Sequence, residues 1–144
     1  MALHLLRMAV KIESIAHLRQ VQADRLREEQ EIGGEFLFTF TRNIPKRAEE
    51  LIVGGSLYWV IKRYIRVRQS ILGLERRENE EGRAFCAIRL DPRHVQVVSR
   101  PQKAFQGWRY LKPEDAPADL HPSRAQIKGL PDEMADELRE LGLL

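Results

Sequence analysis

The spacing of apolar residues in the first part of the chain predicts a strand followed by a helix. Leu3–Val10 is apolar at all but two positions, and a run of this kind bounded by charge indicates a strand buried on at least one face. Ser14 suits a helix N-cap, and beyond it apolar residues recur at helical spacing up to Glu31. Gly33 and Gly34 then end the predicted helix, because glycine is favoured just after a helix C-terminus.

The next segment has the two-residue period that is typical of strands. Phe36, Phe38 and Phe40 alternate with leucine and threonine, which predicts a half-buried strand with three rings on one face. Pro45 suits the first turn of a short helix over residues 46–52, since that position needs no backbone N–H. The pattern therefore predicts a strand that turns sharply into a helix.

Residues 57–71 are rich in β-branched and aromatic side chains and favour strand, either continuous or broken near Arg63. One parity is apolar and faces the core. The opposite parity predicts a basic face with interleaved rings, made of Tyr58, Lys62, Tyr64, Arg66 and Arg68. Such a face either binds phosphates and stacks bases or is a solvated outer surface with arginine stems lying along it.

Further alternating runs predict additional short strands at residues 85–90, 95–101 and 108–111. We therefore expect an α+β fold, a small five- to six-stranded mixed β-barrel with flanking helices. A single domain over residues 1–144 would hold its basic, aromatic barrel core at 36–111. Residues 112–129 contain several prolines and predict an irregular connection, and residues 130–142 predict a C-terminal helix.

The net charge of +3 conceals an uneven distribution. Residues 36–110 carry 15 Lys and Arg against 7 Asp and Glu, whereas both flanks are acidic. All ten aromatic residues lie in the same segment. This asymmetry predicts an anionic partner for the middle of the chain.

The first candidate site is the corner at residues 41–47, where the predicted strand passes into the short helix. It contains Arg42, Asn43, Lys46 and Arg47. Free backbone N–H groups at the start of a helix favour an anion, and the three cations would add to that attraction. The alternative is that the arginines pair with Glu49 or Glu50 on the surface.

Ser56 and Trp108 each have a structural and a functional interpretation, and Trp59 has a structural one. Ser56 follows two glycines, but the segment lacks the spacing and lysine of a phosphate loop, so a helix stop is favoured. Trp59 shares the apolar parity and is predicted to lie in the core. Trp108, next to Arg109, lies where glycine interrupts the strand pattern, so its ring either packs or lines a ligand pocket.

Groups for catalysis or metal binding are scattered along the sequence. The four histidines lack metal-ligand spacing, and we expect neither a metal nor a cofactor. Cys86 is the only cysteine and shares parity with apolar residues, which predicts a buried thiol and a reducing, cytoplasmic location. Leu51–Ile61 is too short to span a bilayer. No catalytic constellation emerges, and a non-enzymatic role is favoured.

Several long strings give the chain a resemblance to a bacterial family, domain of unknown function 1489. These strings are TRNIPKR at 41–47, GGSLYWVIK at 54–62, RQ at 68–69, FQGWRYLKPED at 105–115 and the closing residues 130–144. The resemblance covers nearly the whole chain. One departure is Arg63, where the family is associated with glycine, so a continuous or bulged strand can replace a tight turn there. The family has no established activity to carry over.

A weaker resemblance is to the PUA-like barrels with their ASC-homology and EVE relatives, which often bind RNA or modified bases near a strand–helix corner. It implies that Arg42, Asn43, Lys46 and Arg47 flank a pocket, with Trp59 or Trp108 as the stacking ring. The leading expectation is thus binding of RNA or a modified nucleotide. The alternatives are a small nucleotide- or RNA-modifying enzyme that uses Ser56 or an acidic residue, and a protein-interaction module that uses the C-terminal helix.

Overall fold

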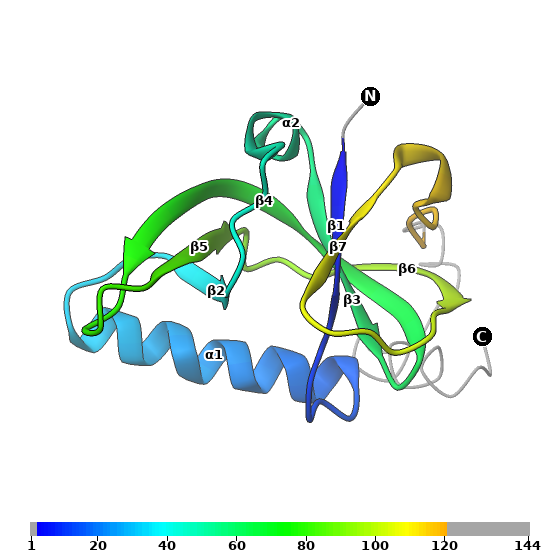
Figure 1. Ribbon diagram of the computed structural model, residues 1–144. Coiled ribbons are helices and arrows are strands. Elements are labelled where there is room, and N and C mark those ends of the chain that lie inside the picture. Colours follow the sequence, from blue (N-terminus) through cyan, green and yellow to red (C-terminus); the bar gives the residue numbers. More distant parts are fainter. Residues whose placement is uncertain (1–2, 121–144) are drawn as a thin grey trace.

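The computed structural model describes residues 3–120 and shows an α+β protein whose longer helix lies beneath one end of a mixed sheet (Figure 1). The strands are β1 (His4–Met8), β2 (Leu37–Thr41), β3 (Ser56–Ile61), β4 (Tyr64–Glu78), β5 (Ala84–Leu90), β6 (Val95–Pro101) and β7 (Trp108–Leu111). The helices are α1 (Ile15–Glu31), α2 (Ala48–Ile52) and the short 3-10 helix η1 (Pro113–Asp115). The α+β prediction is confirmed, whereas the C-terminal helix predicted at 130–142 lies outside the described residues.

The sheet is open, so the prediction of a small barrel is wrong. Within residues 3–120 the sheet has seven strands: six follow the order β2-β5-β4-β3-β1-β7, and the seventh, β6, lies off this path and pairs with β4. β1 and β3 are parallel, and the other pairs are antiparallel. A barrel requires the two terminal strands to pair, but β2 and β7 lie at opposite ends of this order. The topology therefore does not confirm the PUA-like resemblance.

The length of β4 explains why the sheet does not close. Its first part pairs with β3 and β6, and its second part pairs with β5 alone. An irregularity in the register between Ile71 and Gly73 marks the point where β4 changes from pairing with β3 and β6 to pairing with β5. β4 therefore extends the sheet sideways and carries β5 and β2 away from β7 (Figure 1).

A two-residue hairpin turn separates β3 from β4. Lys62 and Arg63 have φ values of 49° and 69°, and Ile61 pairs with Tyr64 across the turn. Positive φ at both central residues is the signature of the type I′ turn, which matches the twist of two antiparallel strands. The chain thus keeps a tight turn with arginine at the second position, where left-handed backbone normally favours glycine.

Two apolar cores cover the two faces of β3, and every residue of this strand is buried. The larger core includes Leu57 and Trp59 and lies on the α1 side, whereas the smaller core includes Tyr58 and Val60. The sequence predicted a basic outer face for the parity of Tyr58. Instead, β1, β6 and β7 supply Leu6, Val97 and Leu111 to a second core on that side.

Helix α1 begins where the sequence predicts. Ser14 has an extended backbone, and its hydroxyl oxygen accepts a hydrogen bond from the N–H of His17 at 3.0 Å. Ile15, Leu18 and Gln22 form the buried stripe that packs against the sheet. Within the described residues, no helix is long and apolar enough to cross a membrane.

Candidate nucleic-acid interface

The corner between β2 and α2 is held in place by β7, far away in the sequence. The indole N–H of Trp108 donates to the carbonyl oxygen of Asn43 at 2.9 Å, and the hydroxyl of Thr41 donates to the same carbonyl at 3.0 Å. The hydroxyl oxygen of Tyr110 accepts from the backbone N–H of Arg47 at 3.1 Å. The rings of Trp108 and Tyr110 meet edge to face at 4.9 Å. The structure thus brings together the corner and Trp108, as expected for one site.

The cations of the corner differ in their partners. Arg47 Nη2 lies 2.8 Å from a carboxylate oxygen of Glu50, and its guanidinium lies 5.7 Å from the ring of Tyr110. The hydrogen bond raises the pKa of Arg47 and lowers that of Glu50. Surface pairing, the alternative interpretation of the sequence, therefore holds for Arg47. Arg42 and Lys46 are exposed and form no ion pair with any described residue.

The N-terminus of the short helix α2 attracts an anion less strongly than the sequence predicts. It begins at Ala48 rather than at residue 46, it has five residues, and its N-cap, Arg47, forms no side-chain capping bond. A helix dipole is weak over so few residues. The corner must therefore attract anions mainly through the charges of Arg42 and Lys46.

Ser56 and Tyr58 lie away from the corner, in the smaller core. Ser56 is buried, its hydroxyl oxygen accepts from Arg68 Nη1 at 3.0 Å, and its backbone N–H donates to His4 at 3.0 Å. Two nitrogens of Arg68 each lie 2.7 Å from an oxygen of Asp119. Burial raises the pKa of Tyr58, whose ring meets that of His4 at 5.1 Å. These contacts give Ser56 and Arg68 structural partners within the described residues. The two glycines before Ser56 follow the end of α2, and Gly55 has no room for a side chain, because a Cβ there would lie 2.2 Å from the Leu51 carbonyl oxygen.

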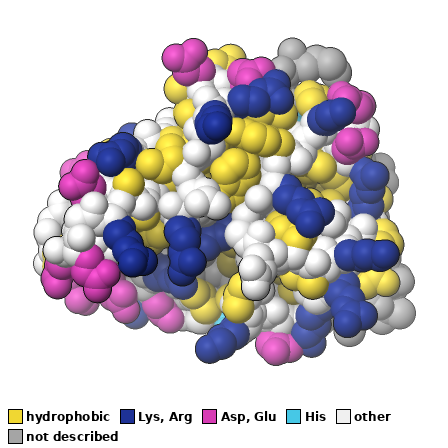
Figure 2. All heavy atoms as spheres, viewed as in Figure 1, with side chains coloured by type: hydrophobic (Ala, Val, Ile, Leu, Met, Phe, Trp, Pro, Cys, Tyr) yellow, Lys and Arg dark blue, Asp and Glu magenta, His cyan; other side chains and the backbone are white. Residues whose placement is uncertain are grey.

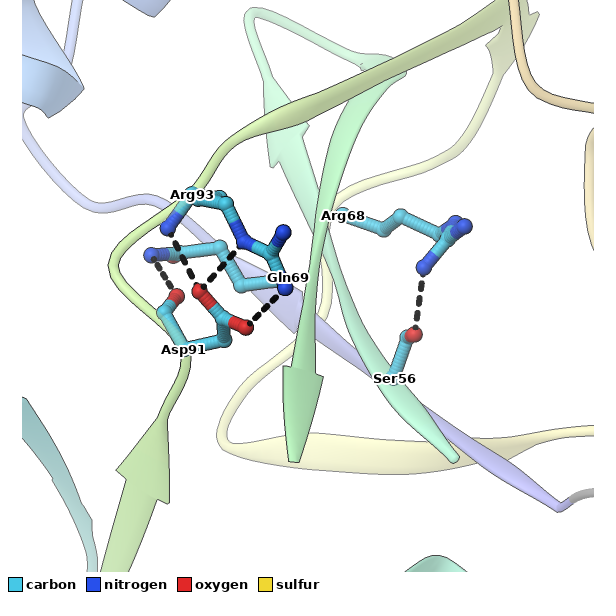
Figure 3. Close-up of polar contacts among 5 residues, drawn as sticks. All are labelled: Ser56, Arg68, Gln69, Asp91 and Arg93. Carbon is cyan, nitrogen blue, oxygen red and sulfur yellow. Dashed lines mark hydrogen bonds and ion pairs between the residues drawn. The ribbon is translucent and has the colours of Figure 1, made fainter. Parts of the chain in front are cut away.

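Trp59 is a core residue, as predicted, and belongs to a buried polar network. Its indole N–H donates to Gln69 Oε1 at 2.8 Å, and the side-chain amides of Gln69 and Gln22 exchange two hydrogen bonds at 2.8 Å. Gln69 also donates to the carbonyl of Asp91 at 3.1 Å. Figure 3 shows that Gln69 and its neighbour Arg68 point to opposite sides of β4. Adjacent residues of one strand thus serve two separate networks.

Lys62 and Arg109 also lie apart from the corner. Lys62 sits in the hairpin turn and pairs with Glu13 at 2.7 Å. Arg109 is exposed, and its guanidinium lies 4.8 Å from the ring of Phe105. It pairs with Leu6 across the β1–β7 ladder, on the face opposite to Trp108 and Tyr110. Of the predicted site residues, only Arg42, Asn43, Lys46, Arg47 and Trp108 share one neighbourhood.

The strongest feature that the sequence interpretation missed is a row of rings on the outer face of β2 and β5. We call Phe36, Phe38, Phe40 and Phe85 the ring ladder. Successive centroids lie 6.5, 6.3 and 5.8 Å apart. Phe36 and Phe40 are 40% and 44% exposed, whereas Leu37, Thr39 and Thr41 point into the protein. The three rings share a face, as predicted, but that face looks outward.

Two arginines lie over the ring ladder. The guanidinium carbon of Arg89 is 3.5 Å from the centroid of Phe36, and that of Arg77 is 4.5 Å from the centroid of Phe38. Glu75 pairs with Arg77 at 2.8 Å, whereas no described carboxylate pairs with Arg89. The last ring of the ladder on β2 is Phe40, two residues before Arg42, so the aromatic surface and the corner adjoin along the chain.

Positive charge also predominates on one face of the molecule. In Figure 2, Lys and Arg side chains are spread over the face shown, between apolar patches, whereas Asp and Glu side chains lie mostly around its rim. A basic face interrupted by apolar surface suits a polyanion that also carries flat apolar groups.

A signal for the ring ladder is present in the sequence of β5. The parity of Cys86, Ile88 and Leu90 was predicted to be buried, and the three side chains are 0%, 0% and 1% exposed. Phe85 and Arg89 occupy the other parity, and an arginine there indicates an outward face. The sequence signal therefore covers β5 alone, and only the structure extends the outward face to β2, where Phe40 meets Phe85.

Groups for other chemistry do not converge in the described part. Residues 3–120 contain no group of three or more His, Cys, Asp or Glu side chains that could hold a metal ion. Burial raises the pKa of the Cys86 thiol, which disfavours the reactive thiolate.

Comparison with known proteins identifies the family. The family model described as "Protein of unknown function (DUF1489)" matches residues 5–144. No curated protein and no solved structure matches the chain. Since the match covers nearly the whole chain, the protein belongs to the DUF1489 family, as the resemblance implied.

Proposed function

We propose that this member of the DUF1489 family binds single-stranded RNA, or a modified nucleotide within it, on the ring ladder and the adjoining corner. The observation that carries the proposal is the exposed ladder itself, with arginines lying on its rings. Contiguous apolar surface of this kind is uncommon on a soluble protein unless it serves an interaction.

The chemistry of the ladder matches that of unpaired bases. Bases stack on aromatic rings and on the flat guanidinium of arginine, and each stacked base contributes about 1–3 kcal/mol. Phe36 to Phe85 offer successive rings about 6 Å apart, with Arg77 and Arg89 as further stacking planes. Bases within a duplex cannot reach such a surface, so a single strand is the preferred ligand.

The corner supplies the charges that a phosphate backbone needs. Arg42 and Lys46 are exposed, and the backbone that carries them is fixed by the hydrogen bond that Trp108 donates to Asn43 and the one that Tyr110 accepts from Arg47. A strand that stacks on Phe40 would place its next phosphates near Arg42. We extend the proposal to a cytoplasmic protein, for which the buried Cys86 is the supporting observation.

The decisive experiment measures anisotropy of labelled single-stranded RNA, single-stranded DNA and duplex RNA at two salt concentrations. Phe38→Ser/Phe40→Ser should weaken single-strand binding by about tenfold or more, because two stacking rings are lost. Tyr64→Ser is the matched control, since Tyr64 is also exposed and also has an arginine over its ring. Equal losses in both variants, or no binding by the wild type at low salt, would contradict the proposal.

A charge variant tests the corner separately. Arg42→Ala/Lys46→Ala should flatten the plot of log affinity against log salt by about 1.4, since each phosphate contact on a single strand contributes about 0.7. Arg27→Ala/Arg93→Ala removes the same charge from exposed ion-paired positions elsewhere and should leave the slope unchanged. An unchanged slope in the corner variant would restrict the interface to the ring ladder.

A further inference from the structure

A cavity of about 120 Å³ lies between α1 and the inner face of the sheet. Its polar lining comes from four elements: Arg7 on β1, Gln22 and Arg25 on α1, Thr39 on β2, and Trp59 on β3. Leu18 and other apolar residues complete the wall. The cavity lies on the opposite side of β2 from the ring ladder.

Arg7 is the unusual member of this lining. It is half-buried, its guanidinium donates to the hydroxyl of Thr39, and its central carbon lies 5.8 Å from the ring of Trp59. Among residues 3–120, no carboxylate pairs with Arg7 or with Arg25. Burial and, secondarily, the charge of Arg25 lower the pKa of Arg7. Two positive charges therefore line one cavity without a described counter-charge.

A buried charge is costly unless an opposite charge or several hydrogen bonds compensate it. Arginine has five N–H donors arranged as a fork that fits two oxygens of one anion, and Arg7 uses one group on Thr39. We propose that this cavity binds a small oxyanion group, a phosphate or a carboxylate, held by Arg7 with Arg25 as the second cation.

The size of the cavity limits the ligand. A water molecule takes up about 30 Å³ of liquid, so the cavity has room for about four waters or for one oxyanion group. The cavity is open to solvent, so a larger ligand would place only its anionic group beside Arg7 and extend outward from it. The ligand is thus a free small anion or the terminal group of a larger molecule, such as a 5′-phosphate.

The proposal does not depend on nucleic-acid binding, and its experiment uses the full chain. Thermal melting is followed with inorganic phosphate and with sodium chloride at matched ionic strength, since screening alone acts equally in both. Phosphate should raise the melting temperature of the wild type above the chloride value. Tryptophan fluorescence, which should respond because Trp59 lines the cavity, gives the dissociation constant.

Two variants and one control locate the site. Arg25→Ala removes the exposed cation of the lining and should raise the dissociation constant about tenfold, the usual loss for a hydrogen bond to a charged group. Arg7→Lys keeps the charge but loses the fork and should weaken binding to a similar extent. Arg27→Ala is the control. Arg27 is exposed, lies two residues after Arg25 on α1 and does not line the cavity, so this variant should bind phosphate like the wild type.

The source of the anion follows from a second comparison, between inorganic phosphate and oligonucleotides with a 5′-phosphate or a 5′-hydroxyl. Arg25-dependent binding of phosphate alone identifies a free anion, and an Arg25-dependent preference for the 5′-phosphate identifies a terminal group. Binding that is equal in the Arg25→Ala and Arg27→Ala variants, or no response to any of these anions beyond that to chloride, overturns the proposal. The Phe38→Ser/Phe40→Ser variant should keep its phosphate response, which separates this site from the ring ladder.

Discussion

On each side of the sheet at β2, an arginine lies beside an aromatic ring, but the surroundings of the two pairs are opposite. On the inner face, Arg7 donates to Thr39 and lies 5.8 Å from the ring of Trp59, on the side of the sheet that α1 covers. On the outer face, Arg77 lies 4.5 Å from the ring of Phe38, in contact with solvent. The chemical pair is similar, and the difference lies in what surrounds it.

Burial sets the strength of each arginine–ring contact and the kind of role it can serve. A cation over a ring contributes about 0.5–1 kcal/mol at an exposed site and about 2 kcal/mol or more when water is excluded. The inner side of the sheet satisfies its buried polar groups through specific partners, as Gln69 does with Trp59 and Gln22. The outer face leaves its rings partly uncovered. The inner face therefore suits structural order and a small ligand, and the outer face suits an extended partner.

The largest effect should come from breaking the inner network at Gln69. Gln69→Leu leaves the indole N–H of Trp59 and the amide of Gln22 without their buried partner. Each unpaired group costs about 1–3 kcal/mol, so the free energy of unfolding should fall by about 3 kcal/mol in urea denaturation. Gln106→Leu, on the exposed surface, is the control and should have little effect. A similar loss in both variants would mean that the network does not stabilise the inner face.

A medium effect is expected from acid, through His94. Burial lowers the pKa of His94 from 6.5 to about 4, and its Nε2 lies 2.7 Å from Gln22 Oε1. Because a carbonyl oxygen only accepts, Nε2 carries the hydrogen of the neutral ring. Between pH 6.5 and about 4, His94 is protonated in the unfolded protein but stays neutral in the folded protein. Stability is therefore fully present above pH 6.5 and is lost as the pH falls toward 4.

The size of the acid effect is tested by comparison with His94→Gln, which removes the titrating group. The wild type should lose about 1–2 kcal/mol more than the variant across this window, after an allowance for solvent screening of a partly exposed ring. Urea unfolding at a series of pH values measures the difference. Parallel curves for the two proteins would show that His94 is protonated equally in both states.

The smallest effect should come from the outer face. Arg77→Ala removes an exposed ring contact and the pair with Glu75 and should cost about 0.5–1 kcal/mol. Its neighbour Arg76 pairs with Glu78 but lies over no ring of residues 3–120, so Arg76→Ala should cost less than about 0.5 kcal/mol. The difference isolates the ring contact. If Arg77→Ala lowered the free energy of unfolding more than Gln69→Leu does, the outer face would contribute more to stability than the inner network.

The elements that the sequence predicted correctly depend on local chemistry. Ser14 caps α1 because its side chain meets a backbone N–H three residues away, and this contact needs nothing else from the fold. The alternation of Cys86, Ile88 and Leu90 correctly identified the buried side of β5. Trp59 was correctly placed in the core for the same reason. Periodicity predicts such faces because neighbouring strand residues point to opposite sides.

The predictions that failed required knowledge of what covers each face. Tyr58 and Arg68 do share one side, as their ladder pairing shows, but β1, β6 and β7 bury that side. The barrel was wrong because the length of β4 and its change of partners depend on strand pairing across the whole chain. Which of the predicted binding residues lie together also depended on the tertiary fold, since Ser56, Tyr58, Trp59, Lys62 and Arg109 lie apart from the corner.

By itself, the sequence determined the family, the α+β class, most strand positions and the concentration of positive charge and rings in the middle of the chain. Only the tertiary structure decided that Phe36, Phe38 and Phe40 face outward, that Trp108 reaches the carbonyl of Asn43, and that Arg7 and Arg25 line one cavity. The physical reason is that alternation separates the two sides of a strand, whereas burial, charge compensation and ligand access depend on the distant segments that pack against each side.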